Sequence, residues 1–399
     1  MRILNVTQTY APFFEFGGPP VKVKALAEGM ARKGHEVTVL TADWGLEARL
    51  PQQQNESHDQ SSPFPFGRRQ KINGVSAIYL PNWLHYRATS WNPALGRYLR
   101  ARLADFDVVH IFGLYDLLGP RVAEECRKRA IPYVVEPIGM FVPIVRNLRL
   151  KRWYHRIWGR EMLERAAAIV VTAEQERDDL LAGGFAGNKI VLRRNGVEAP
   201  EKMPERGNFR NGLKLKPEDK LILFLGRVSE KKSPDLLLRA FAGLPKGSGH
   251  LVFVGPDESG MKARLQEMAS RSPIKEYVHF FPALDGEAKW AAYRDSDIFV
   301  LPSQNENFGN TAAEAVATGT PTIVTENCGI APLLDGLAGI VVKHDETALR
   351  DALEGLLGDQ KLYLRLKKGC AEVTTHLGWE QPLNEMETLY SVLARHTVS

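Results

Sequence analysis

The segment 298–324 limits the fold most strongly, because it alternates apolar runs with a helix-forming stretch. An apolar run at 298–301 is followed by a polar loop, an alanine-rich stretch that ends at Gly319, and a second apolar run at 322–324. Two buried strands joined through a helix form the repeating unit of a parallel α/β sheet. Asn310 is placed to be the N-cap of this helix, and Gly319 is placed to end it.

The same alternation runs through both halves of the chain. Residues 198–213, rich in Pro, Gly and charge, have the composition of a linker. Because 399 residues exceed one ordinary domain, we predict two parallel-sheet α/β domains. The last segment, 379–394, has helical periodicity beyond the final strand and is expected to pack back on the first domain. The predicted domains are therefore 1–197 with 380–399, and 198–379.

Composition excludes several classes of protein. Apolar residues make up 44% and charged residues 25%, as in soluble globular proteins, and a net charge of +5 is too small to indicate nucleic-acid binding. The three cysteines are far apart and show no metal-ligand spacing, which favours a reduced, cytoplasmic protein. No apolar run has the length of a signal peptide or a membrane span, so any membrane contact is expected to be peripheral.

The polar loop at 305–309 is the first candidate site. A helix that begins at the carboxyl end of a strand presents unpaired backbone N–H groups to an anion. Glu306 and Glu314 lie beside this helix start, and carboxylates there suit sugar hydroxyls better than phosphate. The combination predicts a nucleotide-sugar site. Gly17-Gly18 after the first strand could also admit a phosphate, although a tight turn explains this pair as well and no GxGxxG is present.

Taken together, these motifs resemble family 4 of the retaining glycosyltransferases, which have the GT-B fold. The resemblance covers most of the chain and rests on Gly17-Gly18, Gly226-Arg227 through Lys231-Lys232, Glu306-Asn307-Phe308-Gly309 and Glu314. It implies two Rossmann-like domains facing a cleft that holds the donor diphosphate. The first domain would be on the acceptor side, and the second would bind the nucleotide sugar.

The resemblance also implies roles for individual residues. Arg227 and Lys232 would stabilise the diphosphate, and Glu306 would contact the transferred sugar. Glu314 would bind the ribose, although a capping box from Thr311 explains this glutamate equally well. No cofactor, metal or enzymic nucleophile is expected. The donor-binding residues would be Gly17, Gly18, Asn307, Phe308, Gly309, Asn310 and Glu314.

The acceptor side departs from the family pattern. Many members have His or Arg in the loop after the fifth strand, where this chain has Ile138, which cannot hydrogen-bond a sugar. His110 and Gly139 are the candidates left for the acceptor side, although a buried strand histidine satisfied by its neighbours is the alternative for His110. The chain also has Pro282 where glycine is frequent, so the nucleobase stays open.

Two further patterns need an interpretation. Residues 146–165 form a basic amphipathic pattern with Trp153, Trp158 and several arginines. Such a helix can contact an anionic membrane, or it can be a surface helix whose aromatic residues face the core. The Asp-x-Asp patterns at 105–107 and 295–297 resemble a metal motif of another glycosyltransferase fold. Each precedes a strand, at the end opposite to ligand sites, so we expect no metal there.

The sequence thus predicts a metal-independent retaining hexosyltransferase. It would move a hexose from a nucleotide-diphosphate sugar to a hydroxyl of a glycan, lipid-linked or polysaccharide. The protein would be cytoplasmic, with peripheral contact at the inner face of the membrane through 146–165. Two alternatives remain open: a sugar-nucleotide epimerase of the same fold and a non-catalytic nucleotide-sugar-binding protein.

Overall fold

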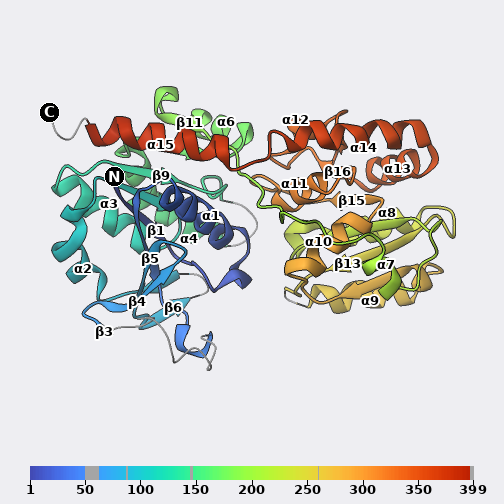
Figure 1. The fold of residues 1–399 in the computed structure, drawn as a ribbon, viewed down its shortest axis with the longest axis horizontal. Helices are drawn as coiled ribbons and strands as arrows, with labels where there is room; N and C mark the ends of the chain where they lie inside the picture. The colour runs from blue at the N-terminus through green and yellow to red at the C-terminus, as the bar shows by residue number, and fades with distance from the viewer. Residues whose placement is uncertain (50–62, 87–88, 144–146, 259, 396–399) are drawn as a thin grey trace. The chain divides into compact units, whose positions relative to one another are not determined.

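The computed structural model describes residues 1–49, 63–86, 89–143, 147–258 and 260–395. The chain forms two compact units, Met1–Asn195 with Trp379–Ser399 (unit 1) and Gly196–Gly378 (unit 2). Each unit is built on a mainly parallel sheet with helices on both faces (Figure 1). The predicted fold class, two Rossmann-like parallel-sheet domains, is therefore confirmed. Among the described residues, no helix is long and apolar enough to cross a membrane.

Within the described residues, unit 1 contains a nine-stranded sheet in the order β11-β10-β9-β8-β1-β2-β5-β4-β3. All neighbours pair in parallel except β4 with β5 and β3 with β4. The strands are β1 (Arg2–Thr7), β2 (Glu36–Ala42), β3 (Pro63–Phe64), β4 (Gly67–Ile72), β5 (Val75–Leu80), β8 (Val108–Phe112), β9 (Tyr133–Glu136), β10 (Ala168–Val171) and β11 (Ile190–Leu192), with a separate hairpin of β6 (Leu84–Tyr86) and β7 (Thr89–Trp91).

The helices of unit 1 cover both faces of this sheet. One face packs against α1 and the C-terminal helix α15, through Leu26, Leu383 and Met386, and the other packs against α2, α3 and α5. Gly29 of α1 lets α15 pack closely, because a Cβ there would lie 2.5 Å from the side-chain methyls of Leu383, which would have to shift. The helices are α1 (Gly18–Arg32), α2 (Leu95–Arg102), α3 (Leu118–Lys128), α4 (Leu148–Tyr154), a π-helical turn (His155–Gly159), α5 (Arg160–Glu164), α6 (Glu174–Ala182) and α15 (Glu380–Arg395).

Within the described residues, unit 2 contains a six-stranded parallel sheet in the order β14-β13-β12-β15-β16-β17. Its strands are mostly apolar because both faces are covered, with alternate residues in two separate clusters. The strands are β12 (Leu221–Leu225), β13 (His250–Val254), β14 (Val278–Phe281), β15 (Ile298–Leu301), β16 (Thr322–Thr325) and β17 (Gly339–Val342). The helices are α7 (Asn208–Gly212), α8 (Pro234–Ala242), α9 (Met261–Ser270), α10 (Gly286–Asp295), α11 (Asn310–Ala317), α12 (Ala331–Leu334), α13 (Glu346–Gly358) and α14 (Gln360–Thr374).

One buried ionic cluster lies under α1 and α15 in unit 1. Glu136, the last residue of β9, accepts from Lys22 Nζ at 2.5 Å and from Arg193 Nη2 at 2.6 Å, and all three side chains are almost completely buried. Burial alone would raise the pKa of Glu136, but the charges of Arg193 and Lys22 lower it to about 2. The two cations thus share Glu136 as their ion-pair partner.

We expect Glu136→Gln to destabilise the protein by about 3–5 kcal/mol, because it leaves Lys22 and Arg193 buried with uncompensated charge. Urea unfolding measures this change. The matched control is Glu124→Gln on the surface of α3, where the carboxylate pairs with Lys128 and stays 38% exposed; it should lose about 1 kcal/mol or less. Equal losses in the two variants would contradict the assigned role of the buried cluster.

Candidate functional site

The order of strands in unit 2 fixes where a site can form. The chain runs outward from β12 to β14, then returns to the other side of β12 and runs outward again from β15 to β17. The loops after β12 and β15 therefore leave neighbouring strands at the same edge and in opposite directions. This is the position where open parallel sheets bind ligands. Arg227 and Lys232 follow β12, and Glu306 follows β15.

Lys232 and Glu306 meet across this switch point. Lys232 Nζ lies 2.8 Å from Glu306 Oε2, and the two side chains are only 13% and 23% exposed. The loops that carry them are also tied together by their backbones, because Gln304 N donates to the carbonyl of Lys231 at 2.9 Å. The sequence-predicted residues Lys232 and Glu306, 74 positions apart, thus form a direct pair.

The backbone holds Glu306 in place. Its N–H donates to the carbonyl of Asn327 at 3.0 Å, and its own carbonyl accepts from Gly329 N at 2.9 Å. Two residues further on, Phe308 is buried in the core of unit 2, and its carbonyl accepts from Ile330 N at 2.7 Å. A carboxylate held on both sides in this way is already oriented before any ligand binds.

The charges around Glu306 keep it ionised. Burial would raise its pKa, but Lys232, Lys231 and Arg227 together lower it. Lys231 is a residue that the motif contained but that was not predicted as part of the site. Its own pKa is lowered by burial and raised in part by Glu306. The sequence signal that could have indicated Lys231 is its position next to Lys232, in the turn after a strand.

Arg227 occupies a more open position than Lys232. Its guanidinium is 47% exposed and lies 3.5 Å from Glu258. The preceding residue, Gly226, passes close to Gly255, the residue directly after β13. A Cβ at Gly255 would lie 1.8 Å from the carbonyl oxygen of Gly226, and φ of Gly255 is +148°. The close approach of the two turns therefore requires glycine at 255.

The start of α11 differs from the prediction. The N-cap is Gly309, with φ of +107° and no side-chain cap, and Asn310 is the first residue of the helix. A left-handed backbone at the cap favours glycine, and a Cβ at Gly309 would lie 3.0 Å from Ile330. The end of the helix agrees with the prediction, because Gly319 has φ of +81° directly after the C-cap Thr318.

Glu314 does not form the predicted capping box. Its carboxylate instead lies 2.9 Å from Lys289 Nζ and accepts from the Tyr293 hydroxyl at 2.8 Å, and both partners belong to α10. Burial raises the pKa of Tyr293 well above its usual range, and the negative charge of Glu314 raises it further. The capping-box interpretation is therefore wrong, because Thr311 lies inside the helix and not at its cap. Lys289 and Tyr293 were not predicted as neighbours of this glutamate.

The candidates in unit 1 lie in three places. Gly17 has φ of +93° and caps α1, which begins at Gly18. His110 is fully buried on β8, with Nδ1 2.6 Å from the Tyr390 hydroxyl. Burial lowers the pKa of His110 to about 3, so the ring is neutral. His110 therefore has no exposed atom for an acceptor. Its Nδ1 is hydrogen-bonded, whereas its buried Nε2 has no hydrogen-bond partner among the described residues and lies 3.6 Å from Glu136 Oε2, so the alternative of a histidine satisfied by its neighbours holds for one ring nitrogen. Gly139 lies in the loop after β9, next to Ile138.

The helical pattern at 146–165 is real but divided between core and surface; Arg146 lies outside the described residues. Tyr154 is buried, and Trp158 packs against the core of unit 1. Trp153 and Leu150 are 52% and 54% exposed. Only some of the aromatic side chains therefore face the core.

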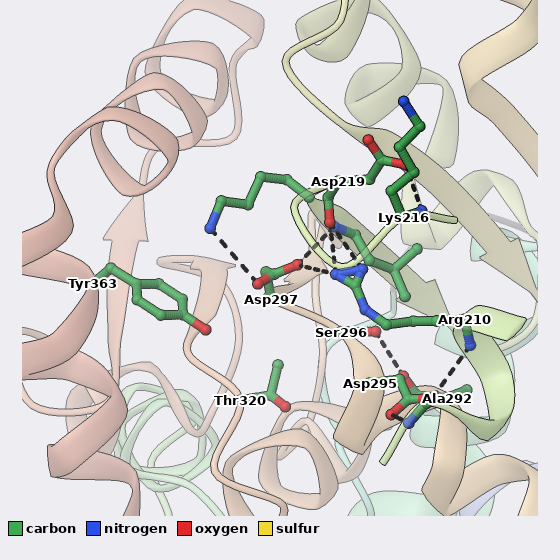
Figure 2. Close-up of polar contacts among 12 residues, drawn as sticks. Arg210, Lys216, Asp219, Ala292, Asp295, Ser296, Asp297, Thr320 and Tyr363 are labelled. Carbon is green, nitrogen blue, oxygen red and sulfur yellow. Dashed lines mark hydrogen bonds and ion pairs between the residues drawn. The ribbon is translucent and has the colours of Figure 1, made fainter. Parts of the chain in front are cut away.

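Figure 2 shows how the Asp-x-Asp pattern at 295–297 is used. Asp295 accepts hydrogen bonds from the backbone N–H groups of Gly207, Phe209 and Arg210, which holds α7 inside the predicted linker. Asp297 accepts from Arg210 Nη2 at 3.0 Å and from the N–H of Leu221 at 2.8 Å. Both carboxylates thus have structural partners at the amino end of β15. In the part of the chain that the structure describes, no group of three His, Cys, Asp or Glu residues is arranged to hold a metal ion.

Comparison with known proteins gives the same assignment along both units. The family models "Glycosyl transferase 4-like domain" and "Glycosyl transferases group 1" match residues 17–196 and 205–372. A D-inositol 3-phosphate glycosyltransferase from Actinosynnema mirum is 29% identical over 355 residues, which are 83% of this chain and 81% of that protein. An uncharacterized glycosyltransferase from Methanocaldococcus jannaschii is 25% identical over 348 residues, 84% and 83% of the two chains.

Solved structures share the fold over the whole length. Sucrose-phosphate synthase from Thermosynechococcus elongatus superposes with a TM-score of 0.78 at 22% identity and 98% coverage of each chain. HepE from Anabaena, in complex with UDP and glucose, superposes at 0.76 with 15% identity, covering 98% of this chain and 100% of that one. Two Rossmann-like units of this topology form the GT-B fold, and the two family models place the chain among the glycosyltransferases. Within that class, this chain belongs to family 4, the group 1 glycosyl transferases.

We expect Asp295→Asn to destabilise unit 2 by about 1–3 kcal/mol, because the amide NH₂ would face backbone donors that a carboxylate accepts. Urea unfolding measures the loss. Millimolar Mn²⁺ should leave the melting temperature of the wild-type protein unchanged, because both carboxylates are already hydrogen-bonded. A metal-dependent rise in melting temperature that Asp295→Asn abolishes would contradict the structural role.

Proposed function

We propose that this chain is a retaining glycosyltransferase that moves a hexose from a nucleotide-diphosphate sugar to a hydroxyl of a glycan, lipid-linked or polysaccharide. The observation that carries the proposal is the Lys232–Glu306 pair at the switch point of unit 2, with Lys231 and Arg227 nearby. The donor-binding unit would be unit 2, and unit 1 would take the acceptor.

The cations and the carboxylates of the site in unit 2 have different roles in this proposal. Breaking the anomeric bond leaves negative charge on the diphosphate, and Arg227, Lys231 and Lys232 place fixed cations where that charge develops. The start of α11, where the helix dipole favours negative charge, would add neutral stabilisation. Glu306, ionised and held by its backbone, would bind a hydroxyl of the transferred sugar. Glu314 would bind the ribose when a hydroxyl replaces Lys289 or Tyr293 as its partner.

The chemistry needs no enzymic nucleophile, metal or cofactor in this proposal. The acceptor hydroxyl would attack on the face from which the diphosphate leaves, and the departing phosphate would take its proton, so the configuration is retained. HepE in complex with UDP-glucose supports a nucleotide-sugar donor. So does the trehalose-6-phosphate protein from E. coli, described with UDP-2-fluoro glucose.

We expect Glu306→Gln and Lys232→Ala each to lower kcat by about a hundredfold or more, because each removes a charge that acts in the transition state. Initial-rate measurements with a panel of nucleotide sugars and glycans test this. The control is Glu346→Gln, which removes a comparable carboxylate from an exposed pair with Arg239 in the same unit and should leave kcat unchanged. Near-normal rates in both site variants would overturn the proposal.

Two outcomes would select the other candidate functions. NMR of the donor incubated alone would show a changed sugar if the protein were an epimerase. Calorimetric donor binding without turnover over the acceptor panel would instead indicate a non-catalytic binding protein.

Residues 147–160 support peripheral contact with an anionic membrane as part of the same proposal. Leu150, Trp153 and Ile157 expose 54%, 52% and 40% of their surface. The sequence has no acidic residue between Glu136 and Glu161, while Arg149, Arg152, Arg156 and Arg160 are all exposed. Arg160 pairs with Glu164 at 2.7 Å, just beyond the segment. Exposed apolar side chains with basic neighbours, in a segment without acidic residues of its own, fit the surface of an acidic bilayer.

Replacing Arg149, Arg152 and Arg156 by Gln should weaken binding to vesicles of acidic phospholipid by roughly a hundredfold, at about 1 kcal/mol per charge. Vesicle co-sedimentation at low salt measures this.

The matched control replaces three exposed arginines of unit 2 by Gln, namely Arg264, Arg271 and Arg365. It therefore has the same net charge as the test variant. It should bind acidic vesicles like the wild type. Equal binding by both triple variants would contradict membrane contact through this segment.

A further inference from the structure

The loop after β9 has an unusual backbone. Ile138 has φ of +56° and Gly139 has φ of +66°, so two successive residues adopt the left-handed region. This conformation is rare for a β-branched residue such as isoleucine and costs on the order of 1–3 kcal/mol. Surrounding contacts must therefore hold the loop in this shape.

Glu176 supplies one of these contacts from another element. It lies in the first turn of α6 and is buried, at 5% exposure. Its Oε1 accepts from the N–H of Gly139 at 2.5 Å, and its Oε2 accepts from the N–H of Thr172 at 3.1 Å. A single carboxylate thus joins the start of α6 to a loop 37 residues earlier in the chain. Hydrogen bonds from backbone N–H groups to a charged acceptor are stronger than neutral ones.

The rest of the loop is held at both ends. The carbonyl of Glu136 accepts from Gly113 N at 2.8 Å, and the carbonyl of Met140 accepts from the Tyr115 hydroxyl at 2.6 Å. The side chain of Ile138 packs against the core under α1. Between these ends, the backbone N–H of Gly139 donates to Glu176. A backbone bond from Met140 N to the carbonyl of Pro137 at 3.2 Å closes the turn, and the carboxylate of Glu176 ties the middle of this turn to α6.

We propose that Glu176 is a positioning residue that fixes the 138–139 backbone for binding of the glycan acceptor, which rests on the proposed function of unit 1. Ile138 brings no hydrogen-bonding side chain to this loop, so the loop can recognise a hydroxyl-bearing acceptor only through its shape and its backbone groups. A shift of about 1 Å in such a surface can change a rate about a hundredfold. The bond to Thr172 by itself would make Glu176 only a cap of α6, and the bond to Gly139 is what links it to the loop.

The test compares Glu176→Gln and Glu176→Ala with the wild type. A glutamine can accept from one of the two N–H groups but presents NH₂ to the other, whereas alanine accepts from neither. The matched control is Glu174→Gln, two residues away in the same helical turn, whose carboxylate pairs with Arg177 at 2.7 Å and is 38% exposed. None of these residues belongs to the donor site in unit 2.

The first readout is hydrogen exchange of the Gly139 amide by NMR, which requires no substrate. We expect exchange to be at least about tenfold faster in Glu176→Ala and unchanged in Glu174→Gln. Unchanged exchange of Gly139 in Glu176→Ala would overturn the positioning role whatever the enzyme does. Faster exchange at the Thr172 amide alone would show that Glu176 only caps α6 and does not position the loop.

The second readout is kinetic. In Glu176→Ala, kcat/KM for the acceptor should fall by about tenfold to a hundredfold, while the affinity for the donor stays that of the wild type. The kcat/KM of Glu176→Gln for the acceptor should lie between those of Glu176→Ala and the wild type. Equal losses for donor and acceptor would indicate general destabilisation and contradict positioning. Absence of transfer in the wild-type protein would count against the proposed function, and the exchange measurement would still decide the role of Glu176.

Discussion

Parallel pairing of β12 with β15 is the constraint on which the site depends. In a parallel sheet every strand ends at the same edge, and the reversal of strand order at β12 leaves two loops that diverge there. Lys232 and Glu306 meet because one follows β12 and the other follows β15. The helix start at Gly309 lies at the same edge for the same reason. No local property of either loop could bring these groups together.

The two units use charge in contrasting ways. In unit 1, Lys22, Arg193 and Glu136 are almost completely buried, so their main effect is on stability and on the uniqueness of the packing under α1 and α15. In unit 2, the Lys232–Glu306 pair remains partly exposed where two loops meet, which is what the proposed exchange of a partner for the donor requires. The carboxylate of Glu314 is also partly exposed and is held by side chains, those of Lys289 and Tyr293 on the neighbouring helix α10.

Much of the fold could be predicted because strand-length apolar runs and helical periodicity are local. The run at 298–301 became β15 with the same bounds, and the run at 322–324 became β16 with one more residue. The prediction was weaker where a distant residue decides the local structure. Asp295 organises α7 within the predicted linker, and Gly309 replaces Asn310 as the cap because the loop must approach Ile330 closely.

The sequence by itself determined the two α/β units, the family and the residue types of the proposed donor site. These depend on hydrophobic periodicity and on short motifs, which act over a few neighbouring residues. Only the tertiary structure decided the partners: Lys289 and Tyr293 for Glu314, Tyr390 for His110, and Glu176 for the backbone of Gly139. Each of these contacts joins residues 21 to 280 positions apart. Their pairing follows from how the elements pack, and burial then sets the charge state of groups such as His110.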